Sequence, residues 1–336
     1  MGLARRFGPC GPTTGLIGAI ACLAAIGGPA VADGAFGATG SDLPTCPPGW
    51  TVEVVAAAPQ LRHPTAVACA PDGRFFVCED YMDMPSPVDR PVNRIVCVHP
   101  DGRVTVFADH MYVAFSMEYI DGKLYVHHCP RFSVFADGGD TAAGRTDLIA
   151  TTNPAPWGSS TRGANQINDH IPAGAQLAMD GYLYLAVGDK GIHGFVGRDG
   201  RRLELPLGGV VRMRPDGTGA EVYATGFRTV LNPAIDARDE IFLYDNNDHL
   251  NIYKTAVGHV VDGGYYGYPW DIRPSRPDYV LPMDVRIYES GAPTGVLAYE
   301  EDGLPAGLGG GGRGGDTATS APHGRRLRPC WPGFRL

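Results

Sequence analysis

One imidazole and two carboxylates flank a single predicted hairpin. Asp169 and His170 precede a short strand, Asp180-Gly181 forms a turn, and an apolar strand leads to Asp189. A hairpin brings its two ends together, so His170 and Asp189 are expected at the same rim of a sheet. A carboxylate beside an imidazole fixes its tautomer and favours its protonated form, which suits a general base. The alternative is that Asp169 caps a turn and His170 bonds only to nearby backbone groups.

The turn of this hairpin belongs to a repeated pattern. An Asp-Gly turn followed by a short strand of aromatic and branched residues recurs at Asp72, Asp121 and Asp180, with a degenerate copy at Asp239. The intervals between these aspartates are 49, 59 and 59 residues, a length that holds several short strands. Asp and Gly tolerate the positive φ angles of a tight hairpin. Because no segment has a long helical period, the pattern predicts an all-β chain built as a β-propeller.

Composition and charge exclude some classes of protein. The chain has 336 residues, 44% hydrophobic and 19% charged, with 47 Gly and 29 Pro. This is the composition of a globular protein with many turns. The net charge is -8 and the body of the chain has no basic cluster, so nucleic acid is excluded as a partner.

Residues 1–32 have the pattern of an export signal. Arg5 and Arg6 precede an apolar run over residues 15–26, and Ala30-Val31-Ala32 offers small residues for cleavage. We therefore expect an exported protein, periplasmic or extracellular, with residues 33–48 as a linker. No second apolar run reaches membrane length, so the mature chain is expected to have no stable membrane span.

Export to an oxidising compartment gives the cysteines a possible structural role. Cys69 and Cys78 flank the turn at Asp72-Gly73 and are expected to face each other across that hairpin. Two readings remain open for this pair, a disulfide or two buried free thiols. No Cys-x-x-Cys is present, which excludes structural zinc sites of that type.

The end of the chain differs from its body. Residues 49–305 are assigned to the propeller, and at the observed interval their roughly 257 residues make four and a half to five blades. Residues 306–336 form a low-complexity tail rich in Gly, Arg and Pro. With 25 Arg and three Lys, the chain has the bias of GC-rich coding DNA, which yields such sequence when the frame is shifted. We interpret the tail as a frameshifted or degenerate end that replaces a final blade; a naturally disordered tail is the alternative.

A set of motifs along residues 49–305 resembles a known family. The segments that carry it are Asp169-His170, Gly188-Asp189-Lys190-Gly191, Gly209 to Gly217, Ala224-Thr225-Gly226-Phe227-Arg228, Asp245-Asn246-Asn247-Asp248 and Gly263 to Trp270. Their order and spacing resemble those of the soluble, pyrroloquinoline quinone (PQQ)-dependent glucose/sorbosone dehydrogenases. The resemblance implies a six-bladed β-propeller that here lacks its final blade. It also implies an enzyme that oxidises a sugar or a related aldehyde or alcohol.

The resemblance assigns roles in the reaction to three residues. His170 corresponds to the general base, and Asp189 to the carboxylate that orients it. Arg228 corresponds to the arginine beside the quinone carbonyl, where its charge stabilises the reduced cofactor. The implied partners are a sugar-like substrate and an external electron acceptor.

Further residues correspond to the binding of cofactor and metal. Calcium ligands are expected from Asp245, Asn246 and Asp248, because a hard cation prefers oxygen atoms. PQQ contacts are expected from Asp169, Arg228, Asn246 and Asn247. An Asx-rich turn without metal is the alternative for residues 245–248.

The sequence also departs from the family. After Arg228 the pattern Asn-Pro-Gln-Gly is replaced by Thr229-Val230-Leu231-Asn232-Pro233-Ala234, and no Lys follows Lys254. Two other functions therefore stay open: a calcium-dependent lactonase-like hydrolase, and a non-catalytic or decayed binding propeller. A lactonase built on metal-bound carboxylates would not need the Asp-His pair.

Two side-chain groups remain outside these assignments. His127, His128 and Cys129 are consecutive, and neighbouring strand residues point to opposite faces, which argues against one shared metal. Tyr265, Tyr266, Tyr268 and Trp270 offer rings that could stack on a sugar or a planar cofactor. The alternative is that they are packing and turn residues.

Overall fold

Each of the repeated turns closes the first hairpin of one sheet. The computed structural model describes residues 54–80, 92–111, 114–128, 131–150, 172–247, 254–271, 277–283, 293–299 and 311–316. Within these residues all regular structure is β-strand. The turns at Asp72, Asp121, Asp180 and Asp239 each join the first two strands of a separate sheet. The repeat intervals thus predicted the blades of the fold.

Two sheets have four antiparallel strands in sequence order. The first contains β1 (Pro64–Cys69), β2 (Phe75–Glu79), β3 (Asn93–Val98) and β4 (Val104–Met111). The second contains β5 (Ala114–Ile120), β6 (Lys123–His128), β7 (Arg131–Asp137) and β8 (Ala142–Ala150). We call these sheets blades 1 and 2.

The later sheets are less regular. Blade 3 contains β9 (Pro172–Leu177), β10 (Leu183–Val187), β13 (Gly208–Met213) and β14 (Glu221–Phe227), with the short β18 (Gly264–Tyr265) added in parallel at its outer edge. A separate hairpin, β11 (Ile192–Val196) and β12 (Arg202–Leu205), is inserted between β10 and β13. Blade 4 contains β15 (Val230–Ile235), β16 (Ile241–Asn247) and β17 (Lys254–Val260), and β19 (Pro293–Tyr299) pairs with β20 (Gly311–Asp316).

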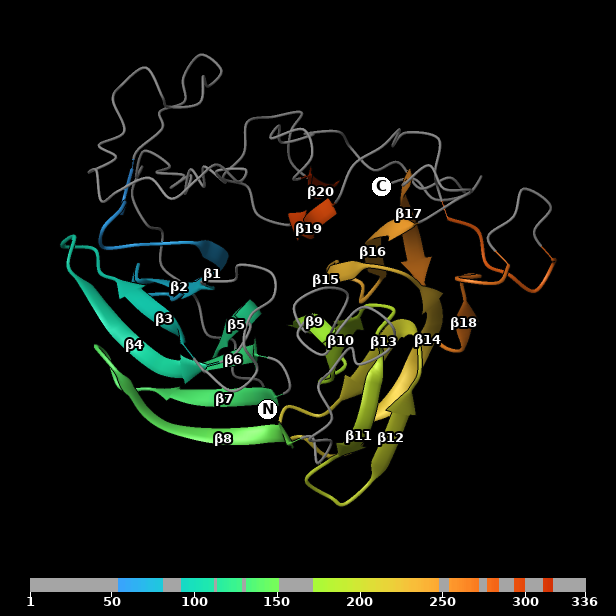
Figure 1. Ribbon diagram of the computed structural model, residues 1–336, viewed down its shortest axis with the longest axis horizontal. Coiled ribbons are helices and arrows are strands. Elements are labelled where there is room, and N and C mark those ends of the chain that lie inside the picture. Colours follow the sequence, from blue (N-terminus) through green and yellow to red (C-terminus); the bar gives the residue numbers. More distant parts are fainter. Residues whose placement is uncertain are drawn as a thin grey trace, which may run out of the picture. The chain divides into compact units, whose positions relative to one another are not determined.

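The first strands of the sheets surround a common centre. β1 contacts β5, β5 contacts β9, β9 contacts β15, and β15 contacts β19. Figure 1 shows these five strands innermost and the last strand of each blade outermost. Successive blades pack face to face, which is the arrangement of a propeller. The expectation of an all-β propeller is confirmed.

The hydrophobic core lies between neighbouring blades. Phe76 of blade 1 packs in one cluster with Leu124 of blade 2. Leu185 belongs to the cluster between blades 2 and 3, whereas its neighbour Tyr184 belongs to the cluster between blades 3 and 4. Alternate residues of β10 point to opposite faces, and each face is covered by a neighbouring blade. Every residue of β10 is therefore buried. This explains why the predicted strands are apolar without alternation.

The Asp180 turn and its degenerate copy each use an aspartate carboxylate and a left-handed residue. The Asp180 carboxylate accepts the backbone N–H of Tyr182 at 2.9 Å, and Gly181 has a φ of 85°. In the degenerate copy, Asp236 accepts the N–H of Arg238 at 2.9 Å, and Asp239 takes the glycine position with a φ of 60°. In the Asp180 turn the residue after the aspartate supplies the left-handed conformation, whereas in the degenerate copy the aspartate that accepts the N–H lies three residues before the left-handed residue. This chemistry is local, and it made the turns visible in the sequence.

The expected pairing of Cys69 and Cys78 is wrong. In the β1–β2 register Cys69 is opposite Phe75, and Cys78 is opposite Ala66. The turn between the strands is short, so the first pair of opposed residues forms directly beside it. The two cysteines therefore belong to different residue pairs. Cys69 is an exposed free thiol, and Cys78 is a buried one whose sulfur lies 3.7 Å from that of Met117. Burial raises the pKa of the Cys78 thiol.

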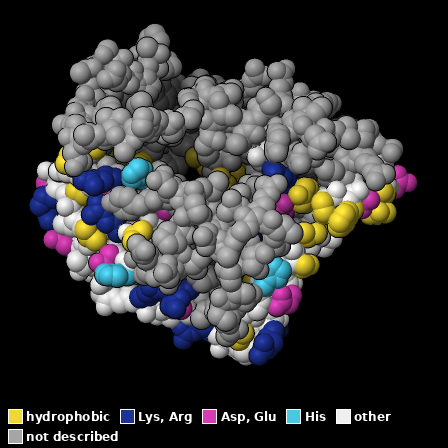
Figure 2. Space-filling model, in the orientation of Figure 1, with side chains coloured by type: hydrophobic (Ala, Val, Ile, Leu, Met, Phe, Trp, Pro, Cys, Tyr) yellow, Lys and Arg dark blue, Asp and Glu magenta, His cyan; other side chains and the backbone are white. Residues whose placement is uncertain are grey.

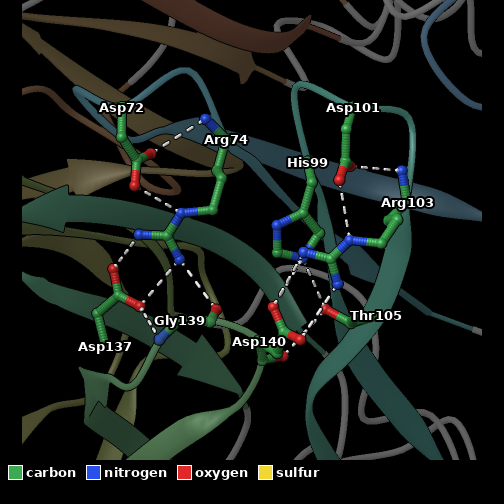
Figure 3. A network of polar contacts seen from close by, with 9 residues as sticks. All are labelled: Asp72, Arg74, His99, Asp101, Arg103, Thr105, Asp137, Gly139 and Asp140. Atoms are coloured by element: carbon green, nitrogen blue, oxygen red, sulfur yellow. Dashed lines mark hydrogen bonds and ion pairs between the residues drawn. The ribbon is translucent and has the colours of Figure 1, made fainter.

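Two Asp-Gly-Arg turns of blade 1 bond to blade 2 through their arginines (Figure 3). Arg74 donates to both oxygens of Asp137, at 3.0 and 2.6 Å, and to the carbonyl oxygen of Gly139 at 2.9 Å. Arg103 donates to Asp140 at 3.2 and 3.4 Å. The Arg74–Asp137 side chains are only 12% and 8% exposed, whereas those of Arg103 and Asp140 are 54% and 57% exposed. The bond to Arg74 holds the pKa of Asp137 down at about 2.

We expect Arg74→Ala to destabilise the protein far more than Arg103→Ala. Loss of Arg74 leaves the Asp137 carboxylate nearly buried without its cation, which should lower the free energy of unfolding by about 3 kcal/mol. The exposed Arg103 pair should contribute less than about 1 kcal/mol. Urea unfolding of both variants at pH 7 measures the difference. Equal losses would contradict the bridging role of Arg74.

A second kind of contact between neighbouring blades occurs twice. Glu118 of β5 accepts the backbone N–H of Leu177 in β9 at 2.9 Å. Gln176 of β9 accepts the N–H of Ile235 in β15 at the same distance, 2.9 Å. Each acceptor stands opposite a tyrosine of its own hairpin, Tyr125 or Tyr184, so the two positions are equivalent. Burial outweighs the bond from Leu177 and raises the pKa of Glu118 to about 7.

We expect Glu118→Gln to stabilise the protein above pH 7. The folded pKa of about 7 lies above the ordinary value of 4.5, so the contribution of Glu118 is present below pH 4.5 and is lost as the pH rises through 7. Because the side chain is partly exposed, the gain at pH 8 should be about 1–2 kcal/mol, with none at pH 4. Glu118→Ala should destabilise at both pH values, since it leaves the Leu177 N–H unpaired. Urea unfolding at pH 4 and 8 measures these shifts; a Gln variant less stable at pH 8 would contradict them.

Parts of the domain organisation lie outside the described residues. These include the predicted export signal, residues 1–32, and the linker, residues 33–48. Of the predicted tail, 306–336, the structure describes β20, which pairs antiparallel with β19. The boundaries at residues 49 and 305 stay predictions. No helix in the described part of the chain is long and apolar enough to cross a membrane.

Candidate functional site

Asp189 and Arg228 meet where blade 3 adjoins blade 4. Asp189 follows β10 at the end away from the Asp180 turn, and Arg228 precedes β15. The backbone N–H of Asp189 donates to the carbonyl oxygen of Arg228 at 2.6 Å. The Tyr268 hydroxyl donates to Oδ2 of Asp189 at 2.8 Å. A carboxylate, a guanidinium-bearing residue and a phenol are therefore gathered at one rim of the propeller.

Arg228 is held by the end of β16. Its Nη1 donates to the carbonyl oxygen of Asn246 at 3.2 Å. Its backbone N–H points to both oxygens of Asp245, at 3.2 and 3.3 Å. Main-chain and side-chain bonds from the same strand thus fix both ends of the residue, so its position is preorganised.

Asp245 anchors the turn that leads into β15. Its carboxylate is fully buried and also accepts the backbone N–H of Thr229 at 2.8 Å. Burial raises its pKa to about 7, against the lowering effect of the N–H groups of Thr229 and Arg228. The oxygen atoms assigned to calcium are thus engaged with the backbone. That role for Asp245 was missed by the sequence analysis.

Blade 1 contains the same anchor. Glu79, at the end of β2, accepts the backbone N–H of Arg62 at 2.6 Å. The N–H of Asp80 donates to the carbonyl oxygen of His63 at 3.0 Å, just as the N–H of Asn246 donates to that of Thr229 at 3.0 Å. A sequence signal existed, because Leu61-Arg62 and Phe227-Arg228 stand at matching places before the first strands of blades 1 and 4. The acidic anchor therefore occurs in both blade 1 and blade 4.

Two polar oxygens beside Arg228 lack a partner among the described residues. Oγ1 of Thr229 and Oδ1 of Asn246 are both buried and make no hydrogen bond there. Buried polar atoms are normally satisfied, and hydroxyl and amide oxygens suit a hard cation or an N–H donor. They fit the ligand chemistry expected at this rim. No group of three His, Cys, Asp or Glu able to hold a metal occurs within the described ranges.

The predicted site residues are only partly described. Asp189, Arg228, Asp245 and Asn246 come together as stated above. Asn247 is the last residue of β16, and nothing is described of its side chain. Asp169, His170 and Asp248 lie outside the described residues. Pro172 is opposite Val187 in the β9–β10 hairpin, and the expected meeting of His170 with Asp189 stays a prediction.

The aromatic residues after β17 have separate roles. Tyr268 contacts Asp189, and burial together with that carboxylate raises the pKa of its phenol. Tyr266 is fully buried and stacks on Phe227 with ring centroids 4.4 Å apart. The rings are recognisable in the sequence, but the bond to Asp189 is not, since Tyr268 and Asp189 are 79 residues apart.

Asn232, in the segment that departs from the family pattern, contacts blade 2. Its Oδ1 accepts the Ser116 hydroxyl of β5 at 3.0 Å. The side chain passes over Gly174 of β9, where an added Cβ would lie 1.5 Å from the same oxygen. The amide of Asn232 is thus committed to packing at the centre of the propeller.

His127 and His128 lie on opposite faces of β6, as the sequence predicted. His127 packs on Phe132, in the cluster shared with blade 3, and His128 lies against Phe135, in the cluster shared with blade 1. Nε2 of His128 is 2.8 Å from the Ser133 hydroxyl. Burial lowers the pKa of both rings to about 3, so both are neutral at pH 7.

Comparison with known proteins gives one family and a set of similar folds. Residues 43–267 match the family model described as a domain of unknown function, DUF7133. No curated protein sequence matches the chain. Among solved structures, an oxidoreductase of Thermus thermophilus described as a glucose dehydrogenase is 18% identical, with a TM-score of 0.51 over 74% of this chain and 76% of that one. Another glucose dehydrogenase is 13% identical, with a TM-score of 0.53 over 80% and 86% of the two chains.

These structural matches concern the fold. At identities of 18% and 13% they do not carry an activity, because one fold hosts many functions. The chain has the propeller fold of the glucose dehydrogenase type, as the resemblance implied. The function has to be argued from the site.

Proposed function

We propose that this chain, which belongs to the DUF7133 family of domains of unknown function, is an oxidoreductase acting on a sugar-like small molecule. The reaction is oxidation at the anomeric or aldehyde carbon, with PQQ as the bound cofactor. The observation that carries the proposal is the junction of blades 3 and 4, where Asp189, Arg228 and Tyr268 are joined by hydrogen bonds of 2.6 and 2.8 Å. Oxidation of an alcohol needs a base for the proton and a cationic group for the charge that develops on the acceptor.

The base is His170, oriented by Asp189. Asp189 is held on its backbone by the carbonyl oxygen of Arg228 and on Oδ2 by Tyr268. A fixed carboxylate would select one imidazole tautomer and favour the imidazolium that forms when the substrate hydroxyl loses its proton. Tyr268 restricts the carboxylate to one rotamer. In this proposal the chain's own residues take the proton and hold it.

Arg228 is the residue proposed to contact the cofactor and stabilise its negative charge. PQQ, when bound, supplies the carbon that accepts the hydride and passes the electrons on to an external acceptor. The Arg228 guanidinium is held by the Asn246 carbonyl oxygen and would stabilise negative charge beside it. Asp169, Asn246 and Asn247 are the further contacts proposed for the cofactor.

Calcium is proposed at residues 245–248. The buried Oδ1 of Asn246 is the described oxygen that best suits the ion, and Asp248 would supply a carboxylate. Asp245 would have to bind through lone pairs that its three backbone N–H bonds leave available. The proposed location is outside the cytoplasm, where the export signal would direct the chain.

Titration of the purified full chain with PQQ, with and without calcium, tests the proposal. Binding is followed by the absorbance of the quinone, and turnover by its bleaching with a panel of aldoses. Calcium-dependent binding, with bleaching that is lost in His170→Ala, is the expected result. A folded chain that binds no PQQ would refute the proposal. Calcium-dependent hydrolysis of a sugar lactone by that chain would favour the lactonase-like alternative.

A further inference from the structure

An aromatic cluster beside Tyr268 is open to solvent. The side chains of Trp270 and Tyr279 are 74% and 65% exposed. Figure 2 shows hydrophobic side chains gathered on the surface near the place where Figure 1 shows β17 and β18. Large rings are normally buried, and an exposed group of them marks a surface used for binding. Trp270 is two residues along the chain from Tyr268, whose hydroxyl donates to Asp189.

The rings of Tyr265 and Tyr279 are held by a shared carboxylate. The hydroxyls of Tyr265 and Tyr279 both donate to Oδ2 of Asp271, at 3.1 and 3.2 Å. The two rings are nearly parallel, with centroids 6.2 Å apart and an interplanar angle of 19°. Burial and the bond to Asp271 raise the pKa of Tyr265 to about 12, so its phenol stays a donor. These two rings are thus positioned before any ligand arrives.

The backbone below the cluster is tied to blade 3. Tyr265 lies in β18, which pairs with β14 at Thr225. The N–H of Tyr266 donates to the Thr225 carbonyl oxygen at 2.9 Å, and the N–H of Leu281 donates to that of Tyr265 at 2.8 Å. Both arms of the cluster, residues 264–271 and 277–283, are therefore attached to one rigid sheet edge. A preorganised surface loses little entropy on binding.

The chemistry of the cluster selects its ligand. Flat rings with polar edges complement the C–H faces of a pyranose, and a carboxylate accepts its hydroxyl groups.

We propose that Trp270, Tyr265 and Tyr279, with Asp271, form a carbohydrate subsite that binds the remote sugar units of an oligosaccharide. This inference rests on the proposed function, because that function places the reacting end of the oligosaccharide at Asp189. The chain end of the oligosaccharide reaches the Asp189 rim while the other units stack on the rings. The preferred substrate is therefore a sugar chain rather than a single sugar.

Calorimetric titration of the cofactor-free full chain with cellotetraose, maltotetraose and glucose tests the subsite without any turnover. At least one tetraose should bind at least tenfold more tightly than glucose. Trp270→Ala should weaken that binding roughly fivefold to tenfold, the scale of one aromatic contact. Tyr279→Phe keeps the ring but loses the bond to Asp271, so a loss of about twofold to threefold is expected. Met179→Ala, a control at a residue 70% exposed in the Asp180 turn, should change nothing.

The outcomes separate the subsite from the reaction. Equal tetraose affinity in the wild type and Trp270→Ala overturns the subsite, as does a folded chain that binds neither tetraose. Turnover of glucose with no binding of tetraoses would also reject the subsite while leaving the dehydrogenase proposal standing. Tetraose binding that depends on Trp270, in a chain that never bleaches PQQ, supports the subsite and rejects the dehydrogenase.

Discussion

Asp189→Asn should lower kcat for sugar oxidation by about 10²-fold or more, within the range that a positioned acid–base group contributes. Asparagine keeps an oxygen for the Tyr268 hydroxyl, which donates to Oδ2 of Asp189 at 2.8 Å, but it lacks the charge that stabilises an imidazolium. A carboxylate raises the pKa of a neighbouring histidine, so its loss lowers that pKa. The acid limb of the kcat/KM profile should therefore move to lower pH while the maximum falls. Steady-state kinetics with PQQ and calcium from pH 5 to 9 measure both effects.

Tyr268→Phe is the matched comparison for Asp189→Asn. It removes the hydrogen bond to Asp189 and keeps the negative charge, so we expect kcat to fall by about tenfold or less with the acid limb unmoved. This split distinguishes orientation of the carboxylate from its charge. An Asp189→Asn enzyme with unchanged kcat, or with an unmoved acid limb, would remove Asp189 from the reaction.

Gly174→Ala should lower the free energy of unfolding by at least about 3 kcal/mol, the range of severe overpacking. A Cβ at this place in β9 would lie 1.5 Å from Oδ1 of Asn232 and 2.5 Å from the carbonyl oxygen of Leu231. The amide cannot simply turn aside, because its oxygen accepts the Ser116 hydroxyl from blade 2 at 3.0 Å. The clash therefore separates the inner strands of three blades. Urea unfolding followed by tryptophan fluorescence measures the loss.

A double-mutant cycle tests the cause of that loss. Asn232→Ala should recover part of the stability of Gly174→Ala, because it removes the nearer contact and leaves the Leu231 carbonyl oxygen in place. Gly144→Ala in β8 is the control: its Cβ meets nothing within 4 Å, so we expect a change near zero or a slight gain. Additive effects of the two substitutions, or a Gly174→Ala protein as stable as Gly144→Ala, would contradict this account of the centre.

Several features of the fold followed from local sequence. The Asp-Gly turns are readable because their chemistry is contained within five residues, as at Asp180, whose carboxylate accepts the N–H of Tyr182. Even the degenerate copy could be recognised, since Asp239 can adopt the positive φ of a glycine. The spacing of these turns then indicated the blades. Hairpins, repeat and all-β class were thus within reach of the sequence.

The pairing register of β1 and β2 could not be predicted from the sequence. Cys69 lies three residues before Asp72 and Cys78 five residues after Gly73, and they pair with Phe75 and Ala66. Register depends on where the first hydrogen-bonded pair forms beside the turn, and a shift of one residue moves every later pair. A disulfide could therefore not be inferred from the two flanking positions alone.

The candidate site also combines features that are recognisable in the sequence with contacts that are not. The residue types could be read from the sequence: carboxylates at the ends of second strands, an arginine before β15, and aromatic residues near Gly264 and Gly267. Three contacts could be seen only in the folded chain: Asp245 anchors a turn, Tyr268 bonds to Asp189 from 79 residues away, and Ser116 reaches Asn232 across 116 residues. The reason is physical: a turn is closed by bonds between near neighbours, whereas these contacts exist only after whole blades have packed side by side.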